Sequence, residues 1–92
     1  MATIHIPTPL RAYTDQQAAV SVAGATVGEA LVALVTKHGA LAKHLRDKSG
    51  KLRSFVNVYV GDEDIRFLEK EATPIAEDAE ITIVPSIAGG AR

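Results

Sequence analysis

The sequence predicts an α+β domain in which one amphipathic helix lies across one face of a mixed sheet. Short β-rich runs stand near both ends of the chain, and the clearest helical pattern lies between them. A chain of 92 residues, 47% of them hydrophobic, has room for one domain with a small core. A helix placed between early and late strands must cross the sheet to bury its apolar side.

The first part of the chain predicts a β-hairpin. Residues 2–6 and 18–23 alternate apolar and polar side chains, which is the period of a half-buried strand. Pro7 and Pro9 end the first strand or confine it to a sheet edge or a bulge. Residues 14–17 are polar and are expected to form the connecting turn.

A capping box at Thr26 and Glu29 predicts the start of a helix over residues 27–38. Gly39 stands where helices commonly end in a left-handed conformation. The apolar residues of this segment follow the spacing of one helical face: Val27, Ala30, Leu31, Leu34 and Val35.

The predicted elements after residue 39 are shorter. The four-residue spacing of Leu41 and Leu45 indicates a further helical turn. Residues 55–60 predict a strand whose two faces differ, with three valines on one side. The valines are expected to face the helix, so that Phe55, Asn57 and Tyr59 point to the other side.

The C-terminal part predicts one more strand. Residues 61–64 are predicted to form a turn. The pattern of residues 65–71 favours no single secondary structure, and a short strand is one interpretation. Residues 81–84 predict the last strand, ended by Pro85, and its isoleucines favour parallel pairing with the first strand at the sheet centre. The residues expected to be buried between helix and sheet are Ile4, Ile6, Leu31, Leu34, Val56, Val58, Ile81 and Ile83.

Composition excludes several classes of function. The absence of cysteine leaves no disulfide, thiolate nucleophile or thiolate metal ligand. No apolar run approaches the ~20 residues that span a bilayer, and no signal segment opens the chain, so the expected location is the cytoplasm, away from membranes. A net charge of -1 gives no case for nucleic acid as a partner.

The charges are nevertheless segregated along the chain. Residues 37–53 hold six bases and one acid, whereas residues 61–80 hold eight acids and two bases. Such a distribution is commonly solvated surface, but it can also orient a protein partner.

No side-chain constellation for catalysis is evident. His38 and His44 are six residues apart, which is not the spacing that places two metal ligands on one helical face, so no metal site is expected. The run Asp62–Asp64 lacks the length and spacing of a calcium loop. No serine lies in a nucleophile-elbow motif. These observations argue against an autonomous enzyme.

The adjacent glycines Gly89 and Gly90 have two interpretations. They can be a flexible terminus without a role. Alternatively, a tail without side chains can enter a narrow tunnel in another enzyme, because no Cβ obstructs the close approach of the backbone.

Four blocks of the sequence together resemble the ThiS/MoaD family of ubiquitin-like sulfur carriers. They are residues 24–31, 52–60, 61–68 and 80–90, they follow one another in the family's order, and the resemblance extends over nearly the whole chain. The resemblance implies a β-grasp fold over residues 1–85, followed by a flexible tail, residues 86–92. Within the family, the opening residues 4–11 are most similar to the CysO-type carriers of cysteine biosynthesis.

The resemblance implies that the reactive group is the carboxylate of Gly90, carried on a tail formed with Ile87, Ala88 and Gly89. An ATP- and magnesium-dependent partner would adenylate it, and sulfur would then give a thiocarboxylate. The sequence departs from mature carriers by continuing with Ala91 and Arg92, which implies a precursor that is trimmed first.

The implied partners carry every cofactor, and none is expected to be bound to this chain. They are the adenylating enzyme, a pyridoxal-phosphate cysteine synthase, and a zinc metallopeptidase that trims the tail and releases cysteine. Phe55 and Tyr59 are candidate docking residues. Three alternatives stay open: the small subunit of a molybdopterin synthase, a protein modifier joined to lysine through Gly90, and an interaction domain with an inert tail.

Overall fold

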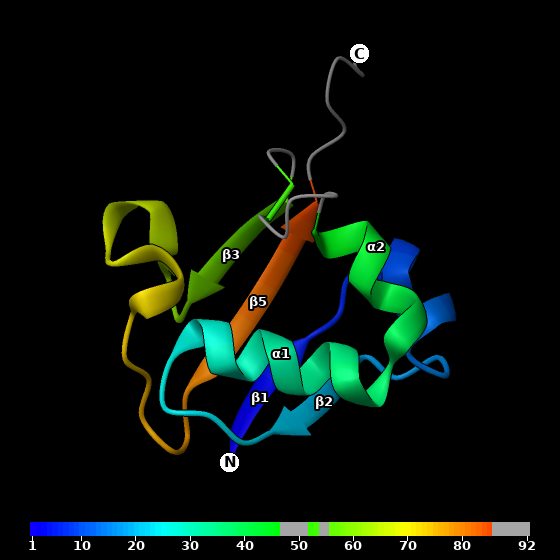
Figure 1. Ribbon diagram of the computed structural model, residues 1–92, viewed down its shortest axis with the longest axis horizontal. Coiled ribbons are helices and arrows are strands. Elements are labelled where there is room, and N and C mark those ends of the chain that lie inside the picture. The colour runs from blue at the N-terminus through cyan, green and yellow to red at the C-terminus, as the bar shows by residue number, and fades with distance from the viewer. Residues whose placement is uncertain (47–51, 54–55, 86–92) are drawn as a thin grey trace.

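The computed structural model describes residues 1–46, 52–53 and 56–85. Its strands form one sheet in the order β2-β1-β5-β3-β4, with the helix α1 (Val27–Lys37) lying across one face (Figure 1). The central pair, β1 and β5, is parallel, as the sequence predicted, and the other pairs are antiparallel. This is the β-grasp topology. The strands are β1 (Ala2–His5), β2 (Ala19–Val22), β3 (Val56–Val60), β4 (Glu63–Asp64) and β5 (Glu80–Pro85).

The hairpin of β1 and β2 is confirmed, but its connection is more structured than a simple turn. A 3-10 helix over Thr8–Tyr13 precedes the turn at residues 14–17. Pro7 stands at its N-terminal cap, and the buried Leu10 attaches it to the core. The sequence missed this helix because only one of its residues, Leu10, is buried, so no apolar periodicity marks it.

The predicted capping box is present in a shifted form. The Thr26 hydroxyl accepts a hydrogen bond from the Glu29 N–H at 3.2 Å. The Glu29 carboxylate, however, accepts from the N–H of Ala25 at 2.9 Å, one residue before the cap. The N–H of Val27 donates instead to the carbonyl of Thr73, so the helix start is fixed to a distant loop as well as to its own cap.

The predicted left-handed end at Gly39 is wrong. Helix α1 ends at Lys37, and Gly39 begins a 3-10 helix over Gly39–Leu41 that runs directly into α2 (Ala42–Leu45). The buried side chains of Leu41 and Leu45 explain this path, because the chain must stay against the core to cover them. The further helical turn predicted from their spacing is confirmed.

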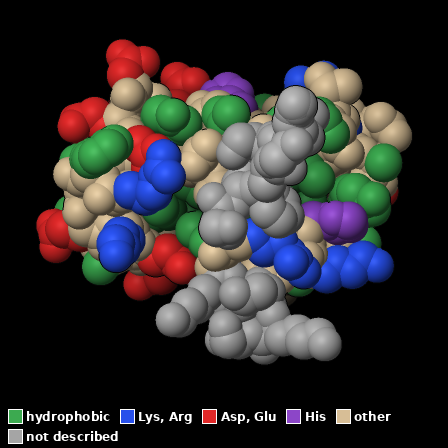
Figure 2. Space-filling view, turned by 90° about the horizontal axis from the view of Figure 1, so that it is seen from above, with side chains coloured by type: hydrophobic (Ala, Val, Ile, Leu, Met, Phe, Trp, Pro, Cys, Tyr) green, Lys and Arg blue, Asp and Glu red, His purple; other side chains and the backbone are tan. Residues whose placement is uncertain are grey.

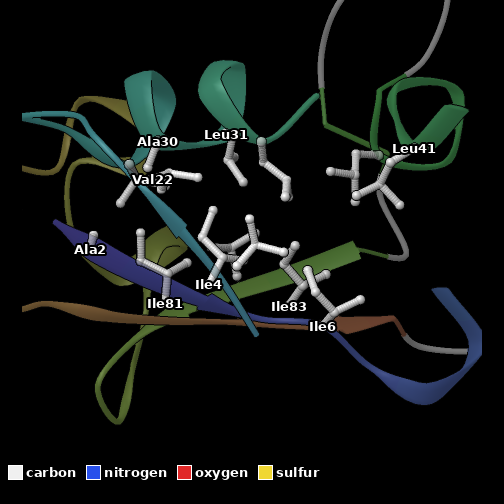
Figure 3. Packing of buried hydrophobic residues seen from close by; sticks show 14 of the residues in the cluster. Ala2, Ile4, Ile6, Val22, Ala30, Leu31, Leu41, Ile81 and Ile83 are labelled. Carbon is white, nitrogen blue, oxygen red and sulfur yellow. The ribbon is translucent and has the colours of Figure 1, made fainter. Parts of the chain in front are cut away.

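The core lies between α1 and the sheet, where the side chains of the two layers interdigitate (Figure 3). All eight residues that the sequence assigned to the core are buried. The buried set also includes Val20, Val22, Leu41, Leu45 and Ile65, which extend it toward β2, α2 and the segment after β4.

The segment after β3 differs from the prediction. Gly61, at φ 59°, turns the chain into β4, and residues 65–71 then form no strand. Two 3-10 helices occupy this region, over Ile65–Phe67 and Lys70–Ala72. The Asp64 carboxylate caps the first of them by accepting the Arg66 N–H at 2.9 Å. A side-chain cap competes with strand pairing for the backbone, which explains why an ambiguous run becomes helical.

Candidate functional site at the C-terminal end of β5

The candidate site is the end of β5, from which the predicted tail continues. Pro85 is the last described residue, and it stands beside Val56 of β3. The site residues predicted from the sequence that lie outside the described residues are Phe55, Ile87, Ala88, Gly89, Gly90, Ala91 and Arg92. What the structure describes is therefore the surface around the base of the tail.

One side of Pro85 borders an open hollow of about 330 Å³. Its apolar part comes from Leu10, Val56 and Pro85, and its polar part from Lys43, His44 and Arg53. The Arg53 Nε–H donates to the carbonyl oxygen of Lys43 at 2.8 Å, which holds the guanidinium beside α2. Lys43 is exposed and forms no ion pair with any described residue.

His44 closes one wall of this hollow. Its ring stacks on Tyr13, with ring centroids 4.1 Å apart, and so joins α2 to the 3-10 helix over Thr8–Tyr13. Its Nε2 is buried and has no hydrogen-bond partner among the described residues. A buried polar atom without a partner is uncommon, and here it lies in the wall of a hollow at the base of the tail.

A second open hollow, of about 320 Å³, lies on the other side of Pro85. The residues that line it include His5, Thr82, Val84 and Arg11. The Arg11 Nε–H donates to the carbonyl oxygen of Ile6 at 3.0 Å, which fixes the guanidinium next to the end of β1.

Three cations therefore surround the last residue of the described chain. We call Arg11, Lys43 and Arg53 the basic collar. Neither hollow beside Pro85 is lined by a described Asp or Glu. Figure 2, which looks at this end of the molecule, shows Lys and Arg side chains beside the end of β5, while acidic side chains gather toward the side of β4.

The sheet face opposite α1 is a second candidate surface. It carries Thr3, His5, Tyr59, Thr82 and Val84, none of which is buried. The alternation predicted for β3 is confirmed, since Val56 and Val58 are buried toward α1 while Tyr59 is not. Tyr59 borders a hollow with Phe67, which is 83% exposed.

Two pairs of oppositely charged side chains stabilise the 3-10 helices that follow β4. The guanidinium of Arg46 binds both oxygens of the Glu71 carboxylate, which attaches α2 to Lys70–Ala72. Arg66 pairs with Asp64, with Nη2 and Oδ2 2.7 Å apart. Hydrogen bonds from the Arg66 side chain and then its backbone N–H lower the pKa of Asp64 below its ordinary value, against the opposing effect of burial.

The described residues bring no three His, Cys, Asp or Glu side chains together at metal-binding distance. None of the helices in the described part of the chain is long and apolar enough to cross a membrane.

Comparison with known families decides the relationship of the chain. The model of the ThiS family matches residues 4–90. The chain belongs to the ThiS family. The match begins in β1 and runs through both glycines of the tail.

Relatives of this ThiS-family chain have been named as carriers. The chain is 44% identical to the sulfur carrier protein CysO of Mycobacterium tuberculosis over 90 residues. The aligned region covers 96% of this chain and 97% of the relative. The crystal structure of that CysO superposes with a TM-score of 0.87 at 42% identity, covering 95% of this chain and all of the other.

Two further structures carry information on partners and on fold. A crystal structure of a BexX/CysO complex from Amycolatopsis orientalis contains a chain matched with a TM-score of 0.89 at 37% identity, over 98% of this chain and 100% of the other. The small archaeal modifier protein 1 of Haloferax volcanii matches with a TM-score of 0.80 at 28% identity, over 97% and 98% of the two chains.

The sequence did not single out the hollows beside Pro85 or the exposed Phe67. Lys43 and Arg53 were visible only as part of a basic run, and Arg11 stands far from that run. No local pattern joins them, because the 3-10 helix over Thr8–Tyr13, α2 and the chain before β3 come together only in the folded molecule.

Proposed function

We propose that this ThiS-family chain is a sulfur carrier, not an enzyme, that works in the cytoplasm and bears sulfur on the carboxylate of Gly90. The observation that carries the proposal is the family match, which runs to Gly90 and leaves out Ala91 and Arg92. The 44% identity to the sulfur carrier protein CysO supports the same assignment.

The chemistry needs a free carboxylate, so Ala91 and Arg92 have to be removed first. In the full chain the Gly90 carbonyl is part of a peptide bond to Ala91. Hydrolysis of that bond by a zinc metallopeptidase of the cell would release the dipeptide and leave the Gly90 carboxylate. The side chain of Arg92 would otherwise obstruct a tunnel shaped for glycine.

Activation then proceeds in two balanced steps on a partner enzyme. A Gly90 carboxylate oxygen attacks the α-phosphorus of magnesium-bound ATP, and pyrophosphate leaves. A sulfur nucleophile attacks the carbonyl carbon of the resulting acyl-adenylate, and AMP leaves. The product is a thiocarboxylate. A chain without cysteine can carry sulfur in this way because the bond forms at its terminus.

In this proposal the sulfur serves cysteine synthesis, which the similarity to CysO supports. The acceptor would be an aminoacrylate, formed from phosphoserine on a pyridoxal-phosphate enzyme. The cysteine formed would remain attached to Gly90 until the zinc metallopeptidase releases it. Both peptidase cuts fall after the same glycine, so one enzyme suffices.

Phe55 and Tyr59 are proposed to help dock these partners. Tyr59 lies on the sheet face that α1 leaves uncovered, and the pairing of Tyr59 with Thr82 places it about 10 Å along β5 from Pro85. A partner that takes the tail can therefore reach Tyr59 with the same surface.

Intact mass spectrometry tests the proposal. The chain ending at Gly90 should be adenylated by the activating enzyme with ATP and, with a sulfur donor, gain the mass difference between sulfur and oxygen. The full-length chain is the matched control and should stay unmodified. A thiocarboxylate on Arg92 of the untrimmed chain, or a trimmed chain that cannot be activated, would overturn it.

Protein modification is the second candidate function, because the small archaeal modifier protein 1 of H. volcanii shares the fold at 28% identity. A modifier would form an isopeptide bond between Gly90 and a lysine, and the same experiment would then give a conjugate of higher mass. A sulfurated pterin, formed with a molybdopterin-synthase large subunit, would instead indicate the small subunit of that enzyme.

A further inference from the structure

We propose that the basic collar, Arg11, Lys43 and Arg53, docks onto an acidic surface around the mouth of the active site that receives the tail. The inference rests on the proposed function, because it assumes that a partner enzyme takes Gly90. It adds the chemistry of the partner surface and the orientation in which the two proteins meet.

The length of the tail brings the partner against the collar. Gly90 is five residues beyond Pro85, and an extended chain spans at most about 3.6 Å per residue, or about 18 Å here. An active site buried inside an enzyme uses most of that length. The rim of its entrance must then contact the surface beside Pro85, which in the described part of the chain includes the two hollows and the collar.

The charge around Pro85 determines what charge the rim of the partner's active-site entrance must carry. The linings of the two hollows contribute three cations and no carboxylate among the described residues. Arg11 and Arg53 are held in place by bonds to backbone carbonyls, so their positions are fixed before docking. A basic rim would meet like charge at a cost, whereas an acidic rim gives complementary potentials.

The hollow beside Lys43 refines the expected contact. Its apolar part, from Leu10, Val56 and Pro85, can receive an apolar side chain of the partner. The expected rim therefore has acidic residues next to an apolar one.

The acidic residues of the turn after β3 and of the start of β5 lie at the opposite end of the sheet and complete the argument. The backbone N–H of Gly61 donates to the carbonyl of Glu80, which places residues 61–63 and the start of β5 at the end away from Pro85. Pro85 is five residues beyond Glu80 in β5, or about 17 Å along the strand. The molecule is thus positive where the tail leaves and negative at the other end, so an acidic entrance attracts it with the tail foremost.

Association kinetics with the BexX protein of A. orientalis test this, because BexX forms a complex with a carrier that is 37% identical to this chain. The chain ending at Gly90 is mixed with BexX at an ionic strength of about 0.01 M and of about 0.15 M, where the Debye length falls from about 30 Å to about 8 Å. The association rate constant of the unsubstituted chain should fall with added salt.

Lys43→Glu is the test variant and Lys70→Glu is the control. Both lysines are exposed and both changes alter the net charge equally, but Lys70 lies beyond β4 in the 3-10 helix over Lys70–Ala72. At low ionic strength, Lys43→Glu should slow association at least about threefold, while Lys70→Glu should not slow it. Thermal unfolding curves confirm that both variants are folded.

Three results would overturn the proposal: equal effects of the two substitutions, an association rate independent of salt, or no association of the unsubstituted chain at low ionic strength. The mass-spectrometric test of the thiocarboxylate uses no binding measurement. A chain that passes that test and fails this one keeps its function and loses the proposed docking surface.

Discussion

At the residue scale, Asp64 shows how one carboxylate fixes the chain after β3. It is one of three buried polar or charged residues in the described chain. Its oxygens accept the Arg66 backbone N–H at 2.9 Å and the Nη2–H at 2.7 Å. Because these bonds favour the charged form, the pKa of Asp64 in the folded protein lies below its ordinary value.

Asp64→Asn should therefore destabilise the protein in a pH-dependent way. A carboxyl group whose pKa is lowered by folding stabilises the folded state above its ordinary pKa, and that stability is lost as the pH falls through the lower, folded value. Urea unfolding should show a less stable variant at neutral pH. The difference from the unsubstituted chain should shrink as the pH falls below about 4.

Asp62→Asn is the matched control, since Asp62 is exposed in the same turn. It should leave the unfolding free energy nearly unchanged. An Asp64→Asn effect of the same size at neutral and acid pH would contradict the electrostatic explanation and leave only the change in packing.

At the scale of the element, helix α1 owes its place to one apolar side. Leu31 is 1% exposed and packs into the core, while its neighbour Val32 is 55% exposed on the solvent side. The capping bond at Thr26 sets where the helix begins, but the burial of this side fixes it against the sheet.

Leu31→Ala should lower the unfolding free energy by ~2–5 kcal/mol, because buried surface is lost and a cavity remains. Ile83→Ala, on the facing strand, should have an effect of similar size. Val32→Ala, the neighbouring control, should change it by less than ~1 kcal/mol. Denaturant unfolding measures all three, and a small effect at Leu31 would be inconsistent with the packing of α1.

At the scale of the whole molecule, the two sides of the sheet have separate tasks. One side builds the core beneath α1, and the other leaves Tyr59 and its neighbours accessible. The end of β5 joins this open side to the basic collar, since the hollow beside Arg11 has Thr82 and Val84 in its lining. A partner can thus contact the tail, the collar and the open side together.

Tyr59→Ala should raise the KM of the activating enzyme for the chain ending at Gly90, because it removes contact area on the open side. Val32→Ala removes an exposed apolar side chain from the opposite side of the molecule and should leave KM unchanged. Steady-state adenylation kinetics give both values. A folded Tyr59→Ala variant with the original KM would show that this side is not part of the interface.

The sequence by itself determined β1, β2, β3 and β5, the main helix and most of the core, because these depend on periodicity and capping within a few residues, but it predicted residues 61–64 as a turn where β4 forms. It also supplied the Gly89–Gly90 tail as the candidate site, through a resemblance to ThiS-family carriers that the family match confirms. It left out the 3-10 helix over Thr8–Tyr13 and predicted a left-handed Gly39, where a second 3-10 helix begins. In these segments single buried leucines, not a repeating pattern, decide the path.

Only the tertiary structure decided the surroundings of the tail. The parallel pairing of β1 with β5 places His5 beside Thr82, which lies near the other end of the chain. That pairing places Arg11 on one side of Pro85, while the packing of α2 places Lys43 and Arg53 on the other. Local sequence cannot encode such a juxtaposition, because it arises from burying distant apolar surfaces in one common core.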